Sequence, residues 1–138
     1  MLLASLGALG VLLTWGISGR LVIKCTVTNA SHEPIRDVIV NMVGSSKDKV
    51  IAVLDSGQSS TFELRPTNET AVELSFEADS RSVYGLCVCG YLEKGYSGSI
   101  DIQITDDRVE AQTSIRLHPL STVIRSKFTH ELSPAAKQ

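Results

Sequence analysis

Apolar and polar side chains alternate with a period of two over most of residues 20–118. The alternation is clearest at Ile100, Ile102 and Ile104, and again from Val109 to Leu117. Residues two apart in a β-strand lie on the same face of the sheet, so this pattern predicts strands that bury one face. Comparable patterns predict further strands at residues 21–27, 37–43, 49–54, 61–65, 72–77 and 83–92.

Short segments rich in Gly, Pro, Asn and Ser separate these runs, as expected of turns. About eight strands result, with no amphipathic helix among them. A sheet with one apolar face must bury that face against another layer. The sequence therefore predicts an all-β fold in which two antiparallel sheets form a sandwich over residues 20–118. Residues 119–138 lose the alternation, and we expect them to form a C-terminal tail.

Residues 1–19 differ from the rest because they contain no charged side chain. As a helix rising 1.5 Å per residue, this segment would be roughly 28 Å long, close to the thickness of the hydrocarbon core of a bilayer. Trp15, Arg20 and Lys24 lie toward its C-terminal end, where aromatic and cationic side chains favour the membrane interface. We therefore expect residues 1–19 to form an uncleaved transmembrane helix that tethers the β-domain.

A cleaved signal peptide is the alternative for residues 1–19. Small residues at Ser18 and Gly19 are compatible with a cleavage site. However, no basic residues precede the apolar run, and the run is longer than the ~7–15 apolar residues of a typical signal peptide. The cations Arg20 and Lys24 follow the segment, and the positive-inside rule then favours a cytoplasmic β-domain.

Composition narrows the possible partners. The chain has 138 residues and a formal net charge of −2, which suits one globular domain. The sequence pI of about 5.9 provides no basic field for binding phosphates, so nucleic acid is not an expected partner. We expect the bilayer to be bound through residues 1–19, and a second protein to be bound by the domain.

The first predicted strands resemble a known kind of domain. Residues 27–31 read Val-Thr-Asn-Ala-Ser, residues 35–40 carry alternating valines, and a Gly-Gln-Ser turn at 57–59 introduces the next strand. This arrangement resembles the opening strands of immunoglobulin-like accessory domains in bacterial surface and membrane proteins. The resemblance implies a sandwich and no catalytic residues. A tryptophan in the core and a Tyr-x-Cys motif, both typical of antibody domains, do not occur in residues 20–118.

Cys87 and Cys89 are the most distinctive local feature, because two thiols two residues apart on a strand share a face. With Cys25 they would supply three soft ligands suited to Cu(I) or Zn(II). The apolar face of that strand, however, contains Leu86, Val88 and Leu92, which places Cys87 and Cys89 on the opposite face. Cys25 shares a face with Ile23 and Val27 and is expected to be buried, so we predict no metal site. Inert thiols or a disulfide from Cys25 remain the alternatives.

Other candidate residues form no recognisable catalytic set. His32, His118 and His130 are far apart in the sequence, and Gly95–Ser99 departs from the G-x-S-x-G nucleophile motif at its last position. Acidic residues at Glu77, Asp79, Asp101, Asp106 and Asp107 lack the spacing of a calcium loop. Asn29 and Asn68 lie in formal glycosylation sequons.

We therefore assign no catalytic, cofactor-binding or metal-ligating residue, and expect a non-enzymatic, single-pass membrane protein. Its β-sandwich is expected to bind or help to assemble partner proteins at a membrane surface. A secreted or periplasmic sandwich released by signal cleavage, and a thiol-based copper or zinc protein, are the alternative hypotheses.

Overall fold

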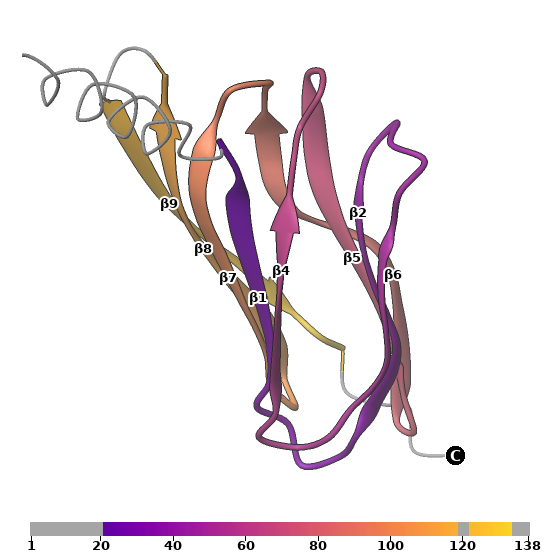
Figure 1. The fold of residues 1–138 in the computed structure, drawn as a ribbon. Helices are drawn as coiled ribbons and strands as arrows, with labels where there is room; N and C mark the ends of the chain where they lie inside the picture. The colour runs from indigo at the N-terminus through magenta and orange to yellow at the C-terminus, as the bar shows by residue number, and fades with distance from the viewer. Residues whose placement is uncertain (1–20, 119–121, 134–138) are drawn as a thin grey trace, which may run out of the picture.

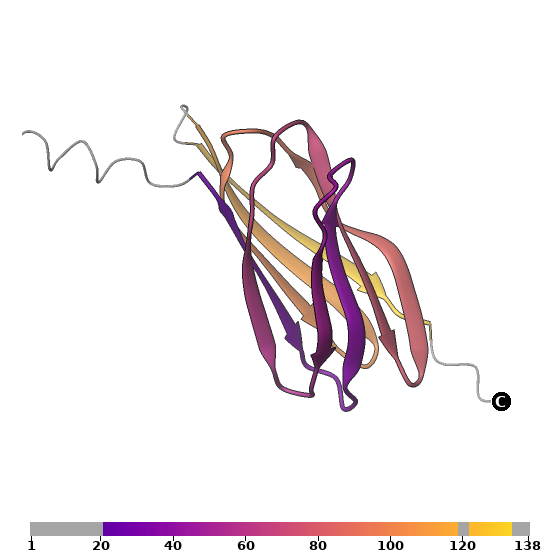
Figure 2. The same ribbon diagram turned by 45° about the vertical axis from the view of Figure 1, so that its right-hand side comes forward.

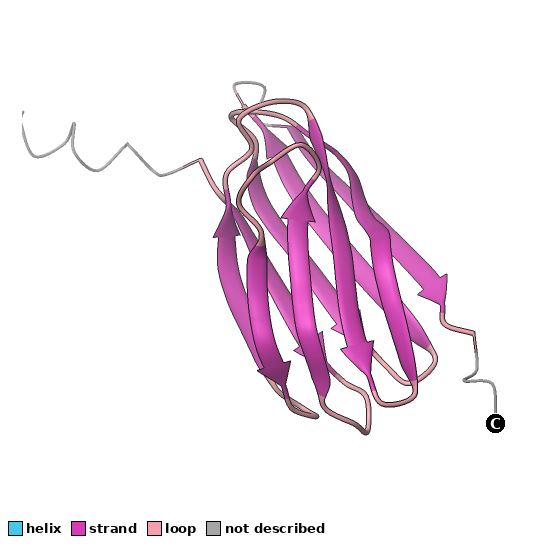
Figure 3. Cartoon of the chain, turned by 90° about the vertical axis from the view of Figure 1, so that its right-hand side faces the viewer, coloured by secondary structure: helices cyan, strands magenta, loops and turns pink. Residues whose placement is uncertain are grey.

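A computed structural model describes residues 21–118 and 122–133 of the chain. Most of these residues lie in β-strands, joined by short turns at the two ends of the molecule (Figures 1 and 3). The strands are β1 (Ile23–Asn29), β2 (Ile35–Met42), β3 (Lys49–Leu54), β4 (Ser59–Leu64), β5 (Thr70–Ala78), β6 (Arg81–Leu92), β7 (Ser97–Ile104), β8 (Arg108–Leu117) and β9 (Thr122–Glu131). The predicted all-β class is confirmed for the described residues.

The strands form two sheets that lie face to face (Figure 1). The five-stranded sheet has the order β4-β1-β7-β8-β9, and the four-stranded sheet has the order β3-β2-β5-β6. The expectation of purely antiparallel sheets is wrong, because β1 and β7 pair in parallel. The chain reverses direction at every turn, so odd-numbered strands all run the same way, and β1 and β7 are both odd-numbered. Hydrophobic alternation carries no information about strand direction.

One apolar core fills the space between the sheets. It is built by alternate side chains, as the sequence pattern predicts. The central strands supply most of the fully buried residues, namely Ile23, Cys25, Val27, Val72, Leu74, Phe76, Ile100, Ile102 and Ile104. The described part of the chain therefore has the two layers and shared core of a sandwich-like fold.

The strand directions define two ends of the molecule. The chain enters β1 at one end, and β9 finishes at the other (Figure 2). We call the first the near end; it includes residues 21–22, 43–49, 65–69, 93–96 and 116–118. We call the second the far end; it includes residues 30–34, 55–58, 79–81, 105–108 and 131–133.

The C-terminal segment is where the sequence prediction differs most from the structure. Residues 122–131, expected to belong to a tail, form β9 and pair with β8 along its whole length. Nine of the ten β9 residues are exposed, so the strand lacks the burial that produces an alternating pattern. Pairing with β8 places it in the sheet.

The faces on which the side chains of β6 lie also differ from the prediction. The pairing of β5 with β6 shifts register near Val72 and Leu74, and Gly85 has a φ of 60°. Cys87 pairs with Glu73 and is exposed, whereas Cys89 pairs with the buried Val72 and packs against the core. The expectation that the two thiols share one face is therefore wrong, because a β-bulge places an extra residue between them.

The predicted transmembrane helix at residues 1–19 lies outside the described residues. Within residues 21–118 and 122–133, no helix is long and apolar enough to cross a membrane.

Candidate functional site

β9 is the outermost strand of the five-stranded sheet, and one of its edges pairs with β8. The ladder between the two strands runs in register from the Leu117–Thr122 pair to the Arg108–Glu131 pair, without a bulge. No described strand pairs with the opposite edge of β9. An edge of this kind presents backbone N–H and C=O groups on which another strand can pair.

The inner face of β9, which points toward the second sheet, is partly apolar. Ile124 lies opposite Ile115, and Phe128 lies opposite Ala111; both β8 residues are buried in the core. Ile124 is nevertheless 51% exposed, whereas Phe128 packs at the margin of the core. The four-stranded sheet approaches the five-stranded sheet through β6 and β8, so the inner face of β9 extends past the covered region.

Two further contacts fix the inner side chains of β9. Thr113 Oγ1 and Ser126 Oγ are 2.5 Å apart in a hydrogen bond between β8 and β9. The rings of Phe128 and His130 stack with an interplanar angle of 3° and a centroid separation of 6.4 Å. The polar Thr113 is thus satisfied at the core margin, and the two rings form a flat surface beside it.

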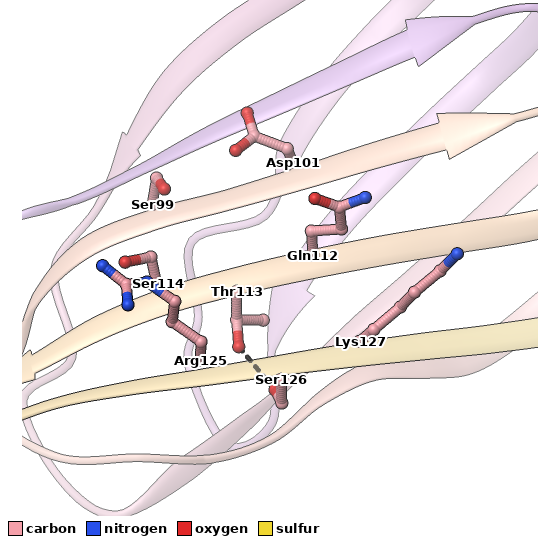
Figure 4. A pocket seen from close by; sticks show the side chains of 8 residues that line it. All are labelled: Ser99, Asp101, Gln112, Thr113, Ser114, Arg125, Ser126 and Lys127. Carbon is pink, nitrogen blue, oxygen red and sulfur yellow. Dashed lines mark hydrogen bonds between the residues drawn. The ribbon is translucent and has the colours of Figure 1, made fainter.

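The outer face of the same strands is polar and carries charges of both signs (Figure 4). A shallow hollow of about 540 Å³ crosses β7, β8 and β9. Its lining includes Asp101 and Gln112 with Arg125 and Lys127 from β9. Lys127 Nζ lies 3.3 Å from Glu110 Oε2, whereas Arg125 makes no ion pair with any described residue. Arg125 is therefore available to an anionic group placed beside β9.

A groove of about 660 Å³ separates the far-end half of β6 from the end of β9. Residues 80–87 form one wall, and residues 130–133 form the other. Leu132 is buried, and its N–H donates to Asp107 O at 2.7 Å, which fixes the chain directly after β9. This side of the molecule is therefore open, with strand β6 on one margin and strand β9 on the other.

The three cysteines occupy different environments. Cys25 is fully buried, and desolvation, followed by the negative charge of Asp101, raises the pKa of its thiol to about 12. Burial also raises the pKa of the half-buried Cys89, whereas Cys87 is exposed on the outer face of β6. The described residues contain no group of three metal-ligating side chains close enough to hold an ion. The predicted burial of Cys25 is confirmed.

The structure brings together one pair that the sequence did not suggest. Ser97 Oγ and His118 Nε2 are 2.9 Å apart at the near end, where β7 begins and β8 ends. Among the described hydrogen bonds, no carboxylate contacts the His118 ring. A serine and a histidine without an orienting acid or an enclosed site lack the geometry of a nucleophilic triad.

The acidic residues are dispersed instead of converging. Asp79 pairs with Arg36 at 2.7 Å, and Asp106 accepts hydrogen bonds from the N–H and the ring of His32. The His32 N–H is the larger cause of a lowered pKa for Asp106. Asp101 lies far from both, midway along β7. Asp79 and Asp106 therefore serve as partners within the far-end turns.

The asparagines of the two sequons differ in solvent exposure. Asn68 is exposed in the β4–β5 turn, whereas Asn29 is fully buried at the end of β1. Asn29 Nδ2 donates to Glu33 O and Leu54 O, and its Oδ1 accepts from the Ser31 N–H and hydroxyl. Asn29 is therefore a structural residue, and its amide nitrogen is inaccessible in the folded domain.

The sequence matches no protein-family model, and neither a curated protein nor a solved structure matches it. The site must therefore be interpreted from its own geometry. A regular edge strand with apolar side chains on one face and cations on the other is suited to binding an extended polypeptide.

Proposed function

We propose that the chain is a non-enzymatic, immunoglobulin-like module that binds an extended segment of a partner protein along β9. Residues 1–19 hold it at a membrane as a transmembrane helix. The observation that carries the proposal is β9 itself, a ten-residue edge strand whose inner face leaves Ile124 half exposed beside the core.

Among the four edge strands of the described sheets, β9 is the best suited to the addition of a partner strand. The other edge strands are β3 and β4, with six residues each, and β6, with twelve. Register shifts interrupt the pairing of β6, and bulges re-aim the backbone groups on both edges of a strand. β9 is long and regular, so a partner segment can form a continuous ladder of roughly 33 Å on it.

The two faces of β9 define the chemistry of the partner segment. Residues opposite Ile124 and Phe128 would complete the apolar margin of the core, and residues opposite Arg125 and Lys127 would face cations. Successive residues of a strand point to opposite faces. The partner segment therefore alternates apolar with acidic or polar side chains.

Site-specific photocrosslinking tests this function. A photoreactive amino acid replaces Ile124 in the full chain, and the matched control replaces Val53 on the edge strand β3. These two side chains have nearly equal exposure, 51% and 52%. After irradiation in native membranes, mass spectrometry identifies the crosslinked peptide, and a synthetic copy of that peptide is titrated against the purified full chain.

We expect position 124 to crosslink to one alternating segment of another protein, and position 53 not to. Ile124→Lys should weaken peptide binding about tenfold, because completing the burial of an isoleucine is worth on the order of 1.5 kcal/mol. Val53→Lys should leave the affinity unchanged. Crosslinks only to lipid, or only to a second copy of the chain, would refute the partner segment.

The tether is tested separately. A chain that begins at Met1 and resists carbonate extraction supports the membrane helix. A chain that begins near Arg20 and appears in the soluble fraction would instead support the released, secreted form.

A further inference from the structure

The two ends of the sandwich carry opposite charge. Near-end residues include more cations than anions, namely Lys47, Lys49, Arg65, Lys94 and Arg116 against Asp48, Glu69 and Glu93. Far-end residues show the reverse, with Glu33, Asp55, Asp79, Asp106, Asp107 and Glu131 against Arg81 and Arg108. The described domain is therefore a dipole with its positive pole where the chain enters β1.

The near-end cations are also available for binding. Arg65 pairs with Glu63 at 2.8 Å, but Lys47, Lys49, Lys94 and Arg116 make no ion pair with any described residue. At the far end, by contrast, Asp79 pairs with Arg36, and Asp106 accepts a hydrogen bond from the His32 N–H. The near end thus presents a net positive charge carried mainly by cations without ion-pair partners among the described residues.

Exposed apolar side chains gather toward the same end. Of the large hydrophobic residues exposed in the described structure, most lie within two residues of the near-end limit of a strand: Leu21, Val43, Val50, Tyr91, Val123 and Ile124. The remaining two are Val53 and Tyr84, both in the far-end half of their strands. Positive charge and exposed apolar surface therefore coincide.

A tyrosine pair strengthens this coincidence. Tyr91 and Tyr96 pack edge to face across the β6–β7 turn, with ring centroids 6.3 Å apart, and Lys94 lies between them in sequence. The hydrogen bond that Tyr91 donates to Glu93 raises the pKa of its hydroxyl to about 12. Aromatic rings with a polar tip, next to lysines, are typical of surfaces at the level of lipid headgroups.

The point at which the chain enters the domain indicates what this surface contacts. Residue 21 lies at the near end, so the uncharged segment 1–19 joins the domain there. We propose that the near end is a lipid-contacting surface that docks the sandwich upright on anionic headgroups. The proposal rests on the membrane tether proposed above. Positive charge at the near end attracts an anionic leaflet, and negative charge at the far end is repelled by it.

A quenching experiment with the full chain in lipid nanodiscs tests the docking. A fluorescent non-natural amino acid replaces Ser46 in a near-end turn or, as a control position, Ala30 in a far-end turn; both residues are exposed. A fraction of the lipids carries a nitroxide on the headgroup. Separately, acyl-chain bromines quench Trp15, the single tryptophan of the chain, and report whether residues 1–19 are inserted.

We expect strong quenching at position 46 and little at position 30 in nanodiscs that contain phosphatidylserine. The double variant Lys47→Gln/Lys94→Gln should lower the ratio of docked to undocked domain roughly thirtyfold, given about 1 kcal/mol for each basic residue near an anionic surface. The matched control Ala30→Glu/Gln58→Glu changes the net charge equally at the far end, and should leave position 46 quenched. Pure phosphatidylcholine should reproduce the effect of the lysine variant.

The outcomes separate the two proposals. If Trp15 is quenched but position 46 is not, the docking is overturned and the tether stands. The same conclusion follows if Trp15 is quenched and the quenching at position 46 does not depend on lipid charge. Unquenched Trp15 together with carbonate-soluble protein overturns both.

Discussion

Replacement of Asn29 is the sharpest test of how this sandwich is held together. Asn29 is fully buried and uses all of its side-chain hydrogen-bonding groups: Nδ2 donates at 2.9 Å to Glu33 O and at 2.8 Å to Leu54 O. Oδ1 accepts from the Ser31 N–H at 3.0 Å and from its hydroxyl at 2.6 Å. Through these bonds the end of β1 holds the start of β2 and the end of β3.

The expected cost of Asn29→Ala follows from these four bonds. Each contributes about 1 kcal/mol net, and removing one partner leaves the other buried group unpaired at a further cost. The free energy of unfolding should therefore fall by about 3–5 kcal/mol, a large part of the 5–15 kcal/mol that is usual for a domain. Asn29→Asp should be at least as damaging at pH 7, because it turns a carboxylate toward two carbonyl oxygens.

Urea unfolding of the full chain in a non-ionic detergent, followed by circular dichroism, measures this effect. Asn68→Ala is the matched control, since Asn68 is exposed in the β4–β5 turn and should change stability by less than about 0.5 kcal/mol. A loss below about 1 kcal/mol for Asn29→Ala, with an unchanged m-value, would refute the account of Asn29 as the hub of the far-end turns.

Three further predictions concern other parts of the described structure. Gly98→Ala should destabilise the domain by several kcal/mol, because a Cβ at its φ of +141° would lie 2.0 Å from Ser114 O, whereas Gly90→Ala meets nothing within 4 Å; thermal unfolding compares them. In maleimide labelling followed by mass spectrometry, Cys87 should react fast, Cys89 slowly and Cys25 only after unfolding; equal rates would contradict the assigned environments. The pKa of Asp106 is lower in the folded than in the unfolded state, where it is about 3.9. Ionised Asp106 therefore stabilises the fold above that unfolded pKa, and the stabilisation is lost as the pH falls through the pKa of the folded state. The His32 N–H is the largest cause of this shift and remains in His32→Ala, so the variant should retain a lowered Asp106 pKa in an NMR titration. Loss of the whole shift would show that the ring is responsible.

Hydrophobic alternation predicted the strands that the core buries. β7 and β8 each have one face in the core and the other in solvent. Their buried residues are therefore mostly apolar and their exposed residues mostly polar, which produces the alternation seen in the sequence. In β9 only Phe128 packs against the margin of the core, the other nine residues are exposed, and the sequence shows no alternation. An edge strand held by backbone pairing is therefore invisible to a method based on burial.

The cysteine prediction failed in part for a different reason. The prediction assumed that side chains alternate regularly between the two faces of β6 from Leu86 to Leu92. The register shifts near Val72 break this alternation and move Cys89 to the core side. A bulge depends on the partner strand as well as on local sequence, so the single strand gives no warning beyond its glycines. The buried role of Asn29 was hidden similarly, because its four bonds reach three residues in two segments, and Leu54 at the end of β3 is 25 positions away in the sequence.

The proposed membrane surface and the proposed binding edge constrain each other. β9 begins at the near end and finishes at the far end, so its axis points away from the bilayer if the near end rests on headgroups. A partner segment added to β9 would then extend from the headgroups to roughly 33 Å above them, the length of a ten-residue strand. A membrane-bound partner therefore needs only a short link between its own anchor and the segment. Tethering both proteins to one bilayer raises their effective concentration, and it makes an edge of modest affinity sufficient for assembly.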